Sequence, residues 1–365
     1  MIGAIMAWKD QLLGRGEAAF TVPVFDGALK SNRIIEDARI MATLADPEDL
    51  ATDGESVFVA DGSRVCRLAG EGMTEVLVCG GRVTALACLP DGGFAVAING
   101  TSVRIEGGPH HGRSWTASDG EPFNAINSLS VAPGGRLLAT DGSAALPYGE
   151  WKRDLMSLGR TGRVVELRVA DGGARTLSKN MGYAFGAVEI GGQVWASESW
   201  RHHVVRVRDG SRPAAVTDDL PGYPSRMAAA RGGGAWLTCF ALRTQLVEFV
   251  LREHAYRKRM MAEIDPAYWI APALNSGNTF LEPMQGAQLK MMGIVKPWAP
   301  PRSYGLVIRL DEQGLVRYSL HSRFDGKNHG IAAACECRGQ LYMIAKGSRR
   351  LLALDIAAFE KELIG

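Results

Sequence analysis

The chain has 365 residues, of which 46% are hydrophobic and 22% are charged, and its net charge is +2. This composition is typical of a globular protein that buries a large core. A net charge so close to zero gives no sign of the basic surface that binds nucleic acid. The longest apolar runs are much shorter than the roughly 18 residues that span a bilayer. The sequence therefore predicts neither a nucleic-acid partner nor a membrane span.

The N-terminal segment starts with apolar residues but lacks a preceding basic region and a clean small-residue cleavage site, so we interpret it as a short amphipathic lead-in. The six cysteines are scattered and too few for a disulfide scaffold in a chain of this length. Cys335 and Cys337 form the closest pair, but no second cysteine pair or histidine pair lies nearby, so no zinc site is predicted. We take a cytoplasmic location as the default.

Six phrases of one form recur along the chain. In each, a variable residue is followed by a small or polar residue, an apolar pair or triplet, a Gly-containing turn and a second apolar run. In chain order the phrases are EDLA with VFVADG, TALA with FAVAI, NSLSV with LLATDG, FGAV with VWASES, SRMA with AWLTCF, and HGIA with QLYMIAKG. Each phrase predicts a β-hairpin, and further strand patterns follow most of them. Six units of four antiparallel strands indicate an all-β, six-bladed β-propeller.

Two segments are expected to lie outside the regular repeat. Residues 1–45 are expected to hold the lead-in and a strand, from FTVPVF or RIMATLA, that completes the last blade and removes an exposed edge. Residues 46–365 then form the propeller. Residues 243–302 interrupt the fifth blade with REHAYRKRMM and a Pro-rich stretch. Because this interruption is too short to hold a core of its own, it predicts a partly helical insertion over one face.

The first residues of the six phrases predict the functional site. In a propeller the innermost strand of each blade begins at the central channel, so these residues converge on one small volume suited to a small-molecule substrate. They are Glu48, Thr84, Asn127, Phe185, Ser225 and His329. A carboxylate, an amide and an imidazole would be costly to bury there unpaired, which favours a functional role.

Four further residues are candidates for binding around the same channel. Tyr223, Arg226 and Trp200 are candidate wall residues. Asp141, in the phrase ATDGS, either faces the channel entrance or caps its own turn.

Several motifs resemble those of the strictosidine synthase-like proteins. They are GRTGR, ESWRHHVVR, DLPGYP, and SYGLVIRLDEQG followed by GQLY, and the resemblance extends from about Glu48 to Ile356. These proteins are one branch of a six-bladed propeller superfamily that includes gluconolactonases and calcium-dependent lactonases and phosphotriesterases. The resemblance implies the same fold for this chain.

The calcium-dependent members hold the metal at the axis with a Glu, two Asn and an Asp, because Ca²⁺ takes several oxygen ligands. Glu48 and Asn127 match the first two positions. The resemblance places Phe185 at the second Asn and Ser225 at the Asp, so two ligands are lost or weakened. We therefore expect no strong calcium dependence, and we expect Phe185→Asn to raise the affinity for calcium.

True strictosidine synthases use a Glu of the last blade as the acid and base of a Pictet–Spengler condensation. The corresponding residue in this chain is His329 if the repeat sets the register, or Ala332 if one counts back from GQLY. Neither is a glutamate, so we do not expect a Pictet–Spenglerase.

Two functions remain open at the sequence level. The favoured one is a hydrolase of a small lactone or ester, in which His329 acts as general base, Asn127 donates to the oxyanion and Glu48 orients the imidazole or carries the proton. The alternative is a propeller without catalysis that binds a small molecule or a protein partner. A channel filled by Phe185 and its neighbours, without a void, would favour this alternative.

Overall fold

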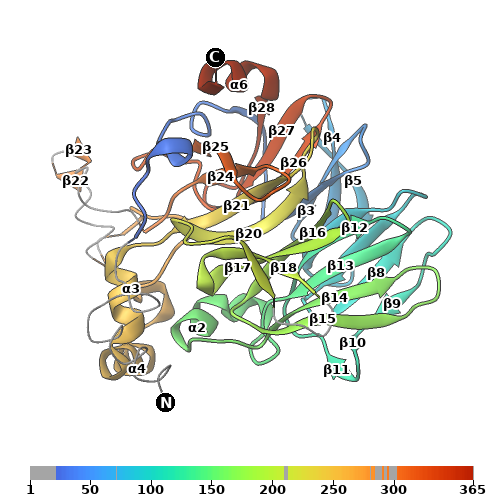
Figure 1. Cartoon of the computed structure of the whole chain (residues 1–365), viewed down its shortest axis with the longest axis horizontal. Helices are drawn as coiled ribbons and strands as arrows, with labels where there is room; N and C mark the ends of the chain where they lie inside the picture. The colour runs from blue at the N-terminus through green and yellow to red at the C-terminus, as the bar shows by residue number, and fades with distance from the viewer. Residues whose placement is uncertain are drawn as a thin grey trace.

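Six four-stranded antiparallel sheets form the blades of the propeller in a computed structural model (Figure 1). The structure describes residues 22–70, 72–208, 213–279, 281–283, 290–291, 294–295 and 302–364. The innermost strands β2, β6, β12, β16, β20 and β26 contact one another in this order, and β26 contacts β2, which closes the ring. The predicted fold class is confirmed.

Each blade runs from an inner strand at the axis to an outer strand at the rim. From inside to outside, the first two blades consist of β2 (Pro47–Thr52), β3 (Val57–Asp61), β4 (Arg64–Ala69) and β5 (Gly72–Val78), and of β6 (Val83–Cys88), β7 (Phe94–Ile98), β8 (Ser102–Glu106) and β9 (Ser114–Trp115). The third and fourth consist of β12 (Ile126–Ala132), β13 (Arg136–Asp141), β14 (Gly162–Arg168) and β15 (Ala174–Met181), and of β16 (Ala184–Ile190), β17 (Gln193–Glu198), β18 (His203–Val207) and β19 (Ala214–Thr217). The last two consist of β20 (Gly222–Ala229), β21 (Ala235–Leu242), β24 (Leu306–Leu310) and β25 (Val316–His321), and of β26 (Ile331–Cys337), β27 (Gln340–Ala345), β28 (Arg350–Asp355) and β1 (Arg39–Thr43). A separate two-stranded ribbon joins β10 (Ala117–Ser118) and β11 (Glu121–Pro122).

The burial of the strands follows their distance from the axis. All five residues of β3 are buried, whereas most residues of β5 are exposed or half-buried. The turn between β2 and β3 shows the local cause of a hairpin. Asp53 accepts hydrogen bonds from the N–H groups of Glu55 and Ser56, and Gly54 adopts φ +94°, a conformation that glycine takes without strain.

A strand from the N-terminal part of the chain completes the last blade. β1 pairs antiparallel with β28, with Arg39 opposite Ala353 and Thr43 opposite Arg350. Because β1 covers the free edge of β28, the ring has no open blade. Of the two candidate segments, RIMAT is the strand, and the described part of FTVPVF, residues 22–25, is not in a strand. The lead-in expected before it falls on residues 1–21, which lie outside the described residues.

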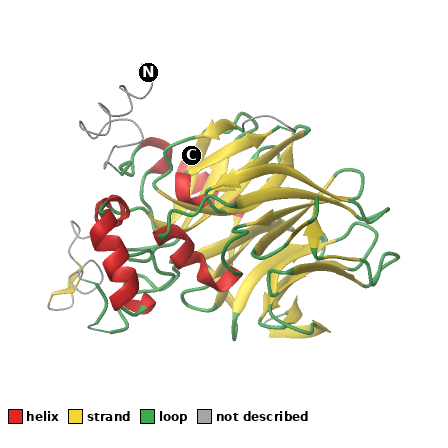
Figure 2. Ribbon diagram, turned by 90° about the horizontal axis from the view of Figure 1, so that it is seen from below, coloured by secondary structure: helices red, strands yellow, loops and turns green. Residues whose placement is uncertain are grey.

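The insertion of the fifth blade lies between β21 and β24 and contains α3 (Gln245–Arg252), α4 (His254–Glu263) and the 3₁₀ turn η5 (Pro266–Tyr268). α3 begins at Thr244, whose side chain accepts a hydrogen bond from the N–H of Val247. Val247 and Val250 pack into an aromatic cluster together with Trp269. In Figure 1, α3 and α4 lie beside α2 (Trp151–Met156), and Figure 2 shows the helices gathered on one side of the strands.

Three 3₁₀ turns, one helix and a two-stranded ribbon are the remaining elements in the described part of the chain. η2 (Gly27–Leu29) precedes β1, η3 (Tyr148–Glu150) leads into α2, and η4 (Ser199–Arg201) joins β17 to β18. α6 (Ile356–Ile364) follows β28, and a small ribbon of β22 (Lys290–Met291) and β23 (Ile294–Val295) lies within the insertion.

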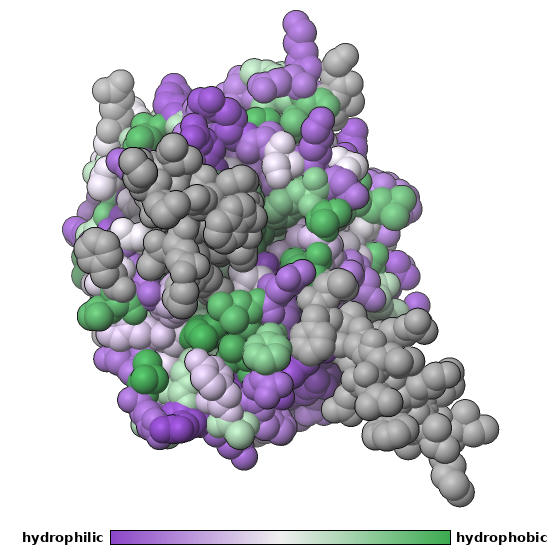
Figure 3. All heavy atoms as spheres, turned by 90° about the vertical axis from the view of Figure 1, so that its left-hand side faces the viewer, coloured by the Kyte–Doolittle hydropathy of each residue, from purple (hydrophilic) through white to green (hydrophobic). Residues whose placement is uncertain are grey.

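The surface of the insertion carries apolar side chains. Leu246, Phe249 and Tyr256 are 37%, 48% and 50% exposed. Figure 3 views the side of the molecule from which the helices project, and apolar residues in green lie there among polar residues in purple. In the part of the chain that the structure describes, no helix has the length and apolar character needed to cross a membrane.

A buried histidine makes the stability of the fold depend on pH. His321 donates its backbone N–H to Asn32, and its ring contacts the hydroxyls of Tyr304 and Ser319. Burial lowers the pKa of His321 to about 4 from the usual 6.5. The neutral form is favoured in the folded state, so stability is complete above pH 6.5 and falls as the pH decreases toward 4.

We expect the free energy of unfolding to fall by about 3 kcal/mol across this window because His321 must be protonated while buried. Urea unfolding at several pH values measures this loss. His321→Gln should make the free energy of unfolding less dependent on pH. His111→Gln, on an exposed loop, should leave this pH dependence unchanged. Equal pH dependence in wild type and His321→Gln would contradict the assignment.

Candidate functional site

The axis of the propeller is occupied by the side chain of Arg226. Arg226 lies in β20, whose pairing with β21 is irregular in register, and its guanidinium is buried. Nη1 donates to the backbone carbonyls of Glu48 at 2.9 Å and Ala332 at 3.3 Å, and Nη2 donates to that of Thr84 at 2.8 Å. One side chain of the fifth blade therefore binds the inner strands of the first, second and sixth blades.

Two carboxylates balance this buried cation. Oε1 of Glu48 lies 3.4 Å from Nη2 of Arg226, and Oδ1 of Asp49 lies 3.2 Å from Nε. Burial raises the pKa of Asp49 to about 6, although Arg226 and two backbone N–H groups oppose the rise. The carboxylates and carbonyls together form an oxygen cage around the guanidinium, which satisfies a charge that would otherwise be costly to bury.

The phenyl ring of Phe185 packs over the guanidinium. The carbon at the centre of the Arg226 guanidinium lies 5.2 Å from the centre of the ring, within the range of a cation–π interaction. Phe185 also contacts Tyr183 and Phe240, which belong to the same aromatic cluster. The residue that stands at an expected metal-ligand position thus stabilises a cation that the protein itself supplies.

A cavity of about 810 Å³ lies between this axis and the insertion, a volume typical of small-molecule sites. Its lining comprises residues near the axis and residues from the loop of η3, from α2 and from the insertion. They include Asp46, Glu48, Arg82, Thr84, Tyr148, Trp151, Lys152, Tyr268, Leu274, Glu282, Arg302, Lys346 and Arg349. The cavity shows that Phe185 and its neighbours do not fill the whole axial region.

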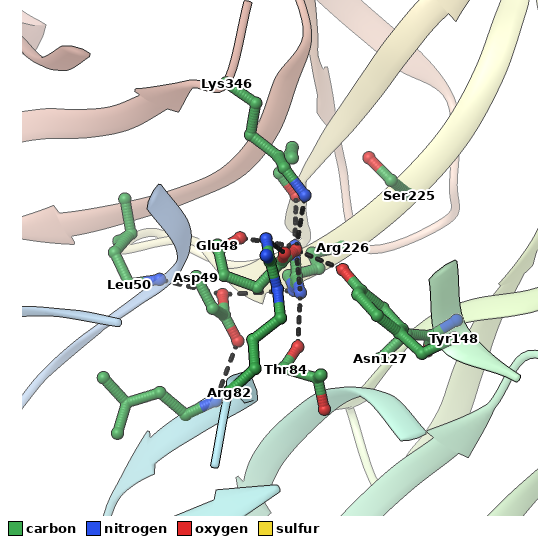
Figure 4. A network of polar contacts seen from close by, with 12 residues as sticks. Glu48, Asp49, Leu50, Arg82, Thr84, Asn127, Tyr148, Ser225, Arg226 and Lys346 are labelled. Carbon is green, nitrogen blue, oxygen red and sulfur yellow. Dashed lines mark hydrogen bonds and ion pairs between the residues drawn. The ribbon is translucent and has the colours of Figure 1, made fainter. Parts of the chain in front are cut away.

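Glu48 is the centre of the polar groups in this cavity (Figure 4). Its carboxylate is fully buried and accepts hydrogen bonds from Nζ of Lys346 at 2.7 Å, from Nη2 of Arg82 at 2.9 Å and from the hydroxyl of Tyr148. Burial alone would raise the pKa of Glu48, but the charges of Lys346 and Arg226 lower it to about 2. Glu48 is therefore ionised at all physiological pH values.

The same environment shifts the pKa values of two partners of Glu48, Lys346 and Tyr148. Burial lowers the pKa of Lys346, although the charge of Glu48 opposes this effect. Burial and the neighbouring carboxylate raise the pKa of Tyr148 well above its usual value, so its hydroxyl is a donor. A carboxylate, an ammonium and a phenol thus meet at one wall of the cavity, which is a set of groups able to transfer protons and to stabilise an oxyanion.

Sequence reasoning found Glu48 but missed Lys346, Arg82 and Tyr148. Lys346 directly follows β27, in the phrase QLYMIAKG, and Arg82 directly precedes β6. Both flank strands of the repeat at their axial ends, so a search of the residues next to each phrase could have found them. Tyr148 comes from the loop before α2, where the repeat gives no signal.

Thr84 lines the cavity as predicted, but Asn127 and Ser225 have structural roles. The amide of Asn127 donates to the carbonyl of Ala184 at 2.9 Å and accepts from the hydroxyl of Thr140 at 2.6 Å. The hydroxyl of Ser225 points to Thr238 of its own blade and lies apart from the network in Figure 4. Both side chains lie outside the cavity lining, so neither is placed to contact a ligand there.

His329 lies near the start of the last blade but outside the cavity lining. Its Nε2 contacts the carbonyl of Arg323 at 2.8 Å and therefore donates, and its Nδ1 accepts from the hydroxyl of Ser303 at 2.8 Å. Burial lowers its pKa, which favours the neutral form of the ring. The expected contact between His329 and Glu48 is not formed, because both ring nitrogens are used elsewhere. Ala332 is the corresponding residue if one counts back from GQLY. Its backbone carbonyl accepts a hydrogen bond from Arg226 at the axis.

Two predicted wall residues, Tyr223 and Trp200, belong to an aromatic cluster beside the axis. Tyr223 is fully buried, and its hydroxyl has no hydrogen-bond partner among the described residues. Trp200 stacks on Tyr183 at 4.6 Å and donates its indole N–H to Asp154 at 2.7 Å. Neither residue lines the cavity. They support the position of Phe185 rather than forming a wall.

Asp141 is part of a buried ion pair and not of the channel entrance. One oxygen accepts from the N–H of Ala125 at 2.8 Å, and the other lies 2.9 Å from Nη2 of Arg163. Both carboxylate oxygens are used by residues outside the turn of Asp141, and Asp141 does not line the cavity, so neither of its two predicted roles is observed.

The residues at the axis do not fit a calcium ion. Ca²⁺ needs several oxygen ligands, but the carboxylate of Glu48 already contacts the cations of Arg82, Arg226 and Lys346, which would repel a divalent cation. Asn127, the other expected ligand, turns its oxygen toward Thr140. Within the described part of the chain, no group of three or more His, Cys, Asp or Glu side chains could hold a metal ion.

This geometry changes the expectation for Phe185→Asn. Because Arg226 keeps its place among the oxygens, we expect no gain in calcium affinity from Phe185→Asn alone. Arg226→Ala should destabilise the fold by about 3–5 kcal/mol, because it leaves Asp49 buried without its cation and removes one of the three cations that contact Glu48. Adding millimolar calcium should then raise the melting temperature of Arg226→Ala, whereas wild type and Phe185→Asn should not respond.

Thermal unfolding with calcium or with a chelator provides this comparison. A chelator-sensitive melting temperature in wild type would show that a metal is bound despite Arg226. Magnesium serves as the control for a general effect of divalent salt.

Comparison with known proteins supports the fold. No protein-family profile matches the sequence. The adipocyte plasma membrane-associated protein of Salmo salar is 22% identical over 370 residues, covering 92% of this chain and 82% of that protein. A gluconolactonase from Xanthomonas campestris has a TM-score of 0.56 and 15% identity, covering 92% of this chain and 95% of its own. The calcium-binding protein regucalcin from Agrobacterium tumefaciens has a TM-score of 0.50 and 11% identity, covering 87% of this chain and 92% of its own.

Proposed function

We propose that this chain, a six-bladed propeller with structural neighbours of the gluconolactonase and regucalcin type, hydrolyses a small lactone or ester without calcium. The observation that carries the proposal is the buried carboxylate of Glu48 in contact with Lys346 and Tyr148 at the wall of the cavity. The name of the Xanthomonas neighbour agrees with this class of reaction. A Pictet–Spengler reaction is not proposed, because neither His329 nor Ala332, the two candidate positions of the last blade, is a glutamate.

The proposed reaction begins with a water molecule beside Glu48. Its oxygen forms a bond to the acyl carbon of the substrate while one of its protons passes to the carboxylate of Glu48. The ammonium of Lys346 and the hydroxyl of Tyr148 stabilise the negative charge on the former carbonyl oxygen. The bond from the acyl carbon to the leaving oxygen then breaks, and the proton from Glu48 passes to that oxygen. The net reaction adds one water molecule and gives a hydroxy acid from a lactone.

The contacts of Glu48 explain how so acidic a carboxylate can serve as a base. Lys346 is the strongest of the influences that lower its pKa. When the ammonium turns toward the oxygen of the substrate, Glu48 loses part of this opposing charge, and its basicity rises at the moment when it must accept a proton. Arg226 and Arg82 remain in contact with Glu48 and hold its position.

Substitution of Glu48 and Lys346 tests the reaction. We expect Glu48→Gln and Lys346→Met each to lower kcat by at least about 100-fold, the usual contribution of a proton-transfer group. Hydrolysis of a set of lactones and aryl esters, with and without chelator, provides the measurement. Lys327→Met, which changes an exposed lysine outside the cavity, is the matched control. Full activity in both site variants would favour the alternative of a propeller that binds a ligand without catalysis.

The pH dependence provides a second test. Glu48 stays ionised down to about pH 2, so its ionisation should not limit the rate between pH 4 and 7. The ammonium of Lys346 is lost as the pH rises, and burial lowers its pKa below the usual 10.5. We therefore expect kcat to fall on the alkaline side, below pH 10.5. Lys346→Arg should move this limb to higher pH, and an unchanged limb would assign it to another group.

We also propose that the protein acts in the cytoplasm. All six cysteines are free thiols in the structure, which fits a reducing compartment. Fractionation of the source cells tests the location.

A further inference from the structure

A second cationic group of the cavity lies away from Glu48. Lys152 of α2 donates its ammonium to the carbonyl of Pro266 at 3.0 Å, and Nη2 of Arg302 donates to the carbonyl of Ala267 at 3.1 Å. Because the two acceptors belong to consecutive residues, the two cations lie next to each other on the cavity lining. α2 and the return of the insertion thus bring together two positive charges from distant parts of the sequence.

Among the described residues, the counter-charges of these two cations are Asp265 for Lys152 and Glu282 for Arg302. The nearest carboxylate to Arg302 is that of Glu282, at 3.9 Å, and Glu282 already accepts the N–H groups of Gly277 and Asn278. The Nε of Arg302 is buried and has no hydrogen-bond partner within the described ranges. Burial and the charge of Arg302 lower the pKa of Lys152 to about 8, although the charge of Asp265 opposes this effect. Lys152 and Arg302 are therefore two neighbouring cations on the cavity lining, and the charge of Asp265 offsets their mutual repulsion only in part.

The rest of the cavity does not supply the remaining negative charge. The lining carries five basic side chains and three carboxylates. Two of these carboxylates already form ion pairs. Asp46 pairs with Arg82, and Glu48 pairs with Arg82 and Lys346. An anion entering the cavity would therefore gain electrostatic energy beside Lys152 and Arg302.

We propose that Lys152 and Arg302 form an anion subsite that binds a carboxylate of the substrate. The acyl group of the same molecule then reaches Glu48 and Lys346 in the same cavity, whose volume of about 810 Å³ accommodates a small ligand. The substrate class is accordingly a small lactone or ester that bears a carboxylate. The naming of this class depends on the proposed hydrolase, whereas the subsite itself depends on the contacts of the two cations.

A purely structural role would give a different result. In that case Lys152 and Arg302 would serve only to hold η5 through the carbonyls of Pro266 and Ala267. Their removal would then weaken the fold, or weaken all ligands equally. An anion subsite instead predicts a loss that depends on the charge of the ligand.

Binding of a matched pair of probes distinguishes the two roles. Tetrahydrofuran carboxylate and its neutral carboxamide have nearly the same shape and lack the acyl–oxygen bond of a lactone or ester. Calorimetric titration of the full chain should show that wild type binds the carboxylate about tenfold more tightly than the carboxamide, as expected for one charged hydrogen-bonded contact. Lys152→Met should remove this preference, Lys152→Arg should keep most of it, and Arg153→Met, a neighbour outside the cavity lining, should leave it unchanged.

The outcomes separate this inference from the proposed hydrolase. If wild type prefers the carboxylate but cleaves neither a carboxylated γ-butyrolactone nor its carboxamide, the subsite stands and the hydrolase is wrong. If wild type cleaves both lactones with the same KM, and Lys152→Met changes neither KM, the hydrolase stands and the subsite is wrong. Equal binding of the two probes to wild type also overturns the subsite.

Discussion

The contact between the guanidinium of Arg226 and its oxygen cage is the interaction on which the axis of this propeller depends. Carbonyls from three other inner strands and the carboxylates of Glu48 and Asp49 all face one cation. In the calcium-dependent proteins that the sequence resembles, a metal ion would supply positive charge at the axis. In this chain a side chain supplies it, and unlike an ion it cannot dissociate. Phe185 covers the guanidinium, so the ring and the cation form one packed unit.

This internal cation determines what the cavity above it can do. Arg226 holds one side of Glu48, and Lys346, Arg82 and Tyr148 approach from the cavity. Glu48 is therefore both an anchor of the axis and an acidic group at the cavity wall. Lys152 and Arg302, which bind carbonyls of the insertion rather than Glu48, also line the cavity. Both groups of residues underlie our proposal of a ligand with an acyl group and a negative charge.

The fold could be predicted from the sequence because it depends on a local pattern repeated six times. Each hairpin is encoded by apolar runs and turn residues that are neighbours in the chain, and the closing strand RIMAT was among the predicted candidates. The site was harder to predict, because the first residue of a phrase indicates which strand lies at the axis but not where its side chain points. Asn127 and His329 have the right chemistry, but their polar atoms are used by Ala184, Thr140, Arg323 and Ser303.

The sequence by itself determined the six blades, the position of the insertion and the replacement of two expected calcium ligands by Phe185 and Ser225. The blades and the insertion follow from residue types at regular spacing, and the replaced ligands follow from the resemblance to the calcium-dependent proteins. Only the tertiary structure decided that Arg226 occupies the axis and that Lys346, Tyr148 and Lys152 reach the cavity. These side chains are long, and they act on strands and loops far from their own position in the chain. A pattern of neighbours along the sequence cannot show such a reach, because it depends on how the blades and the insertion pack together.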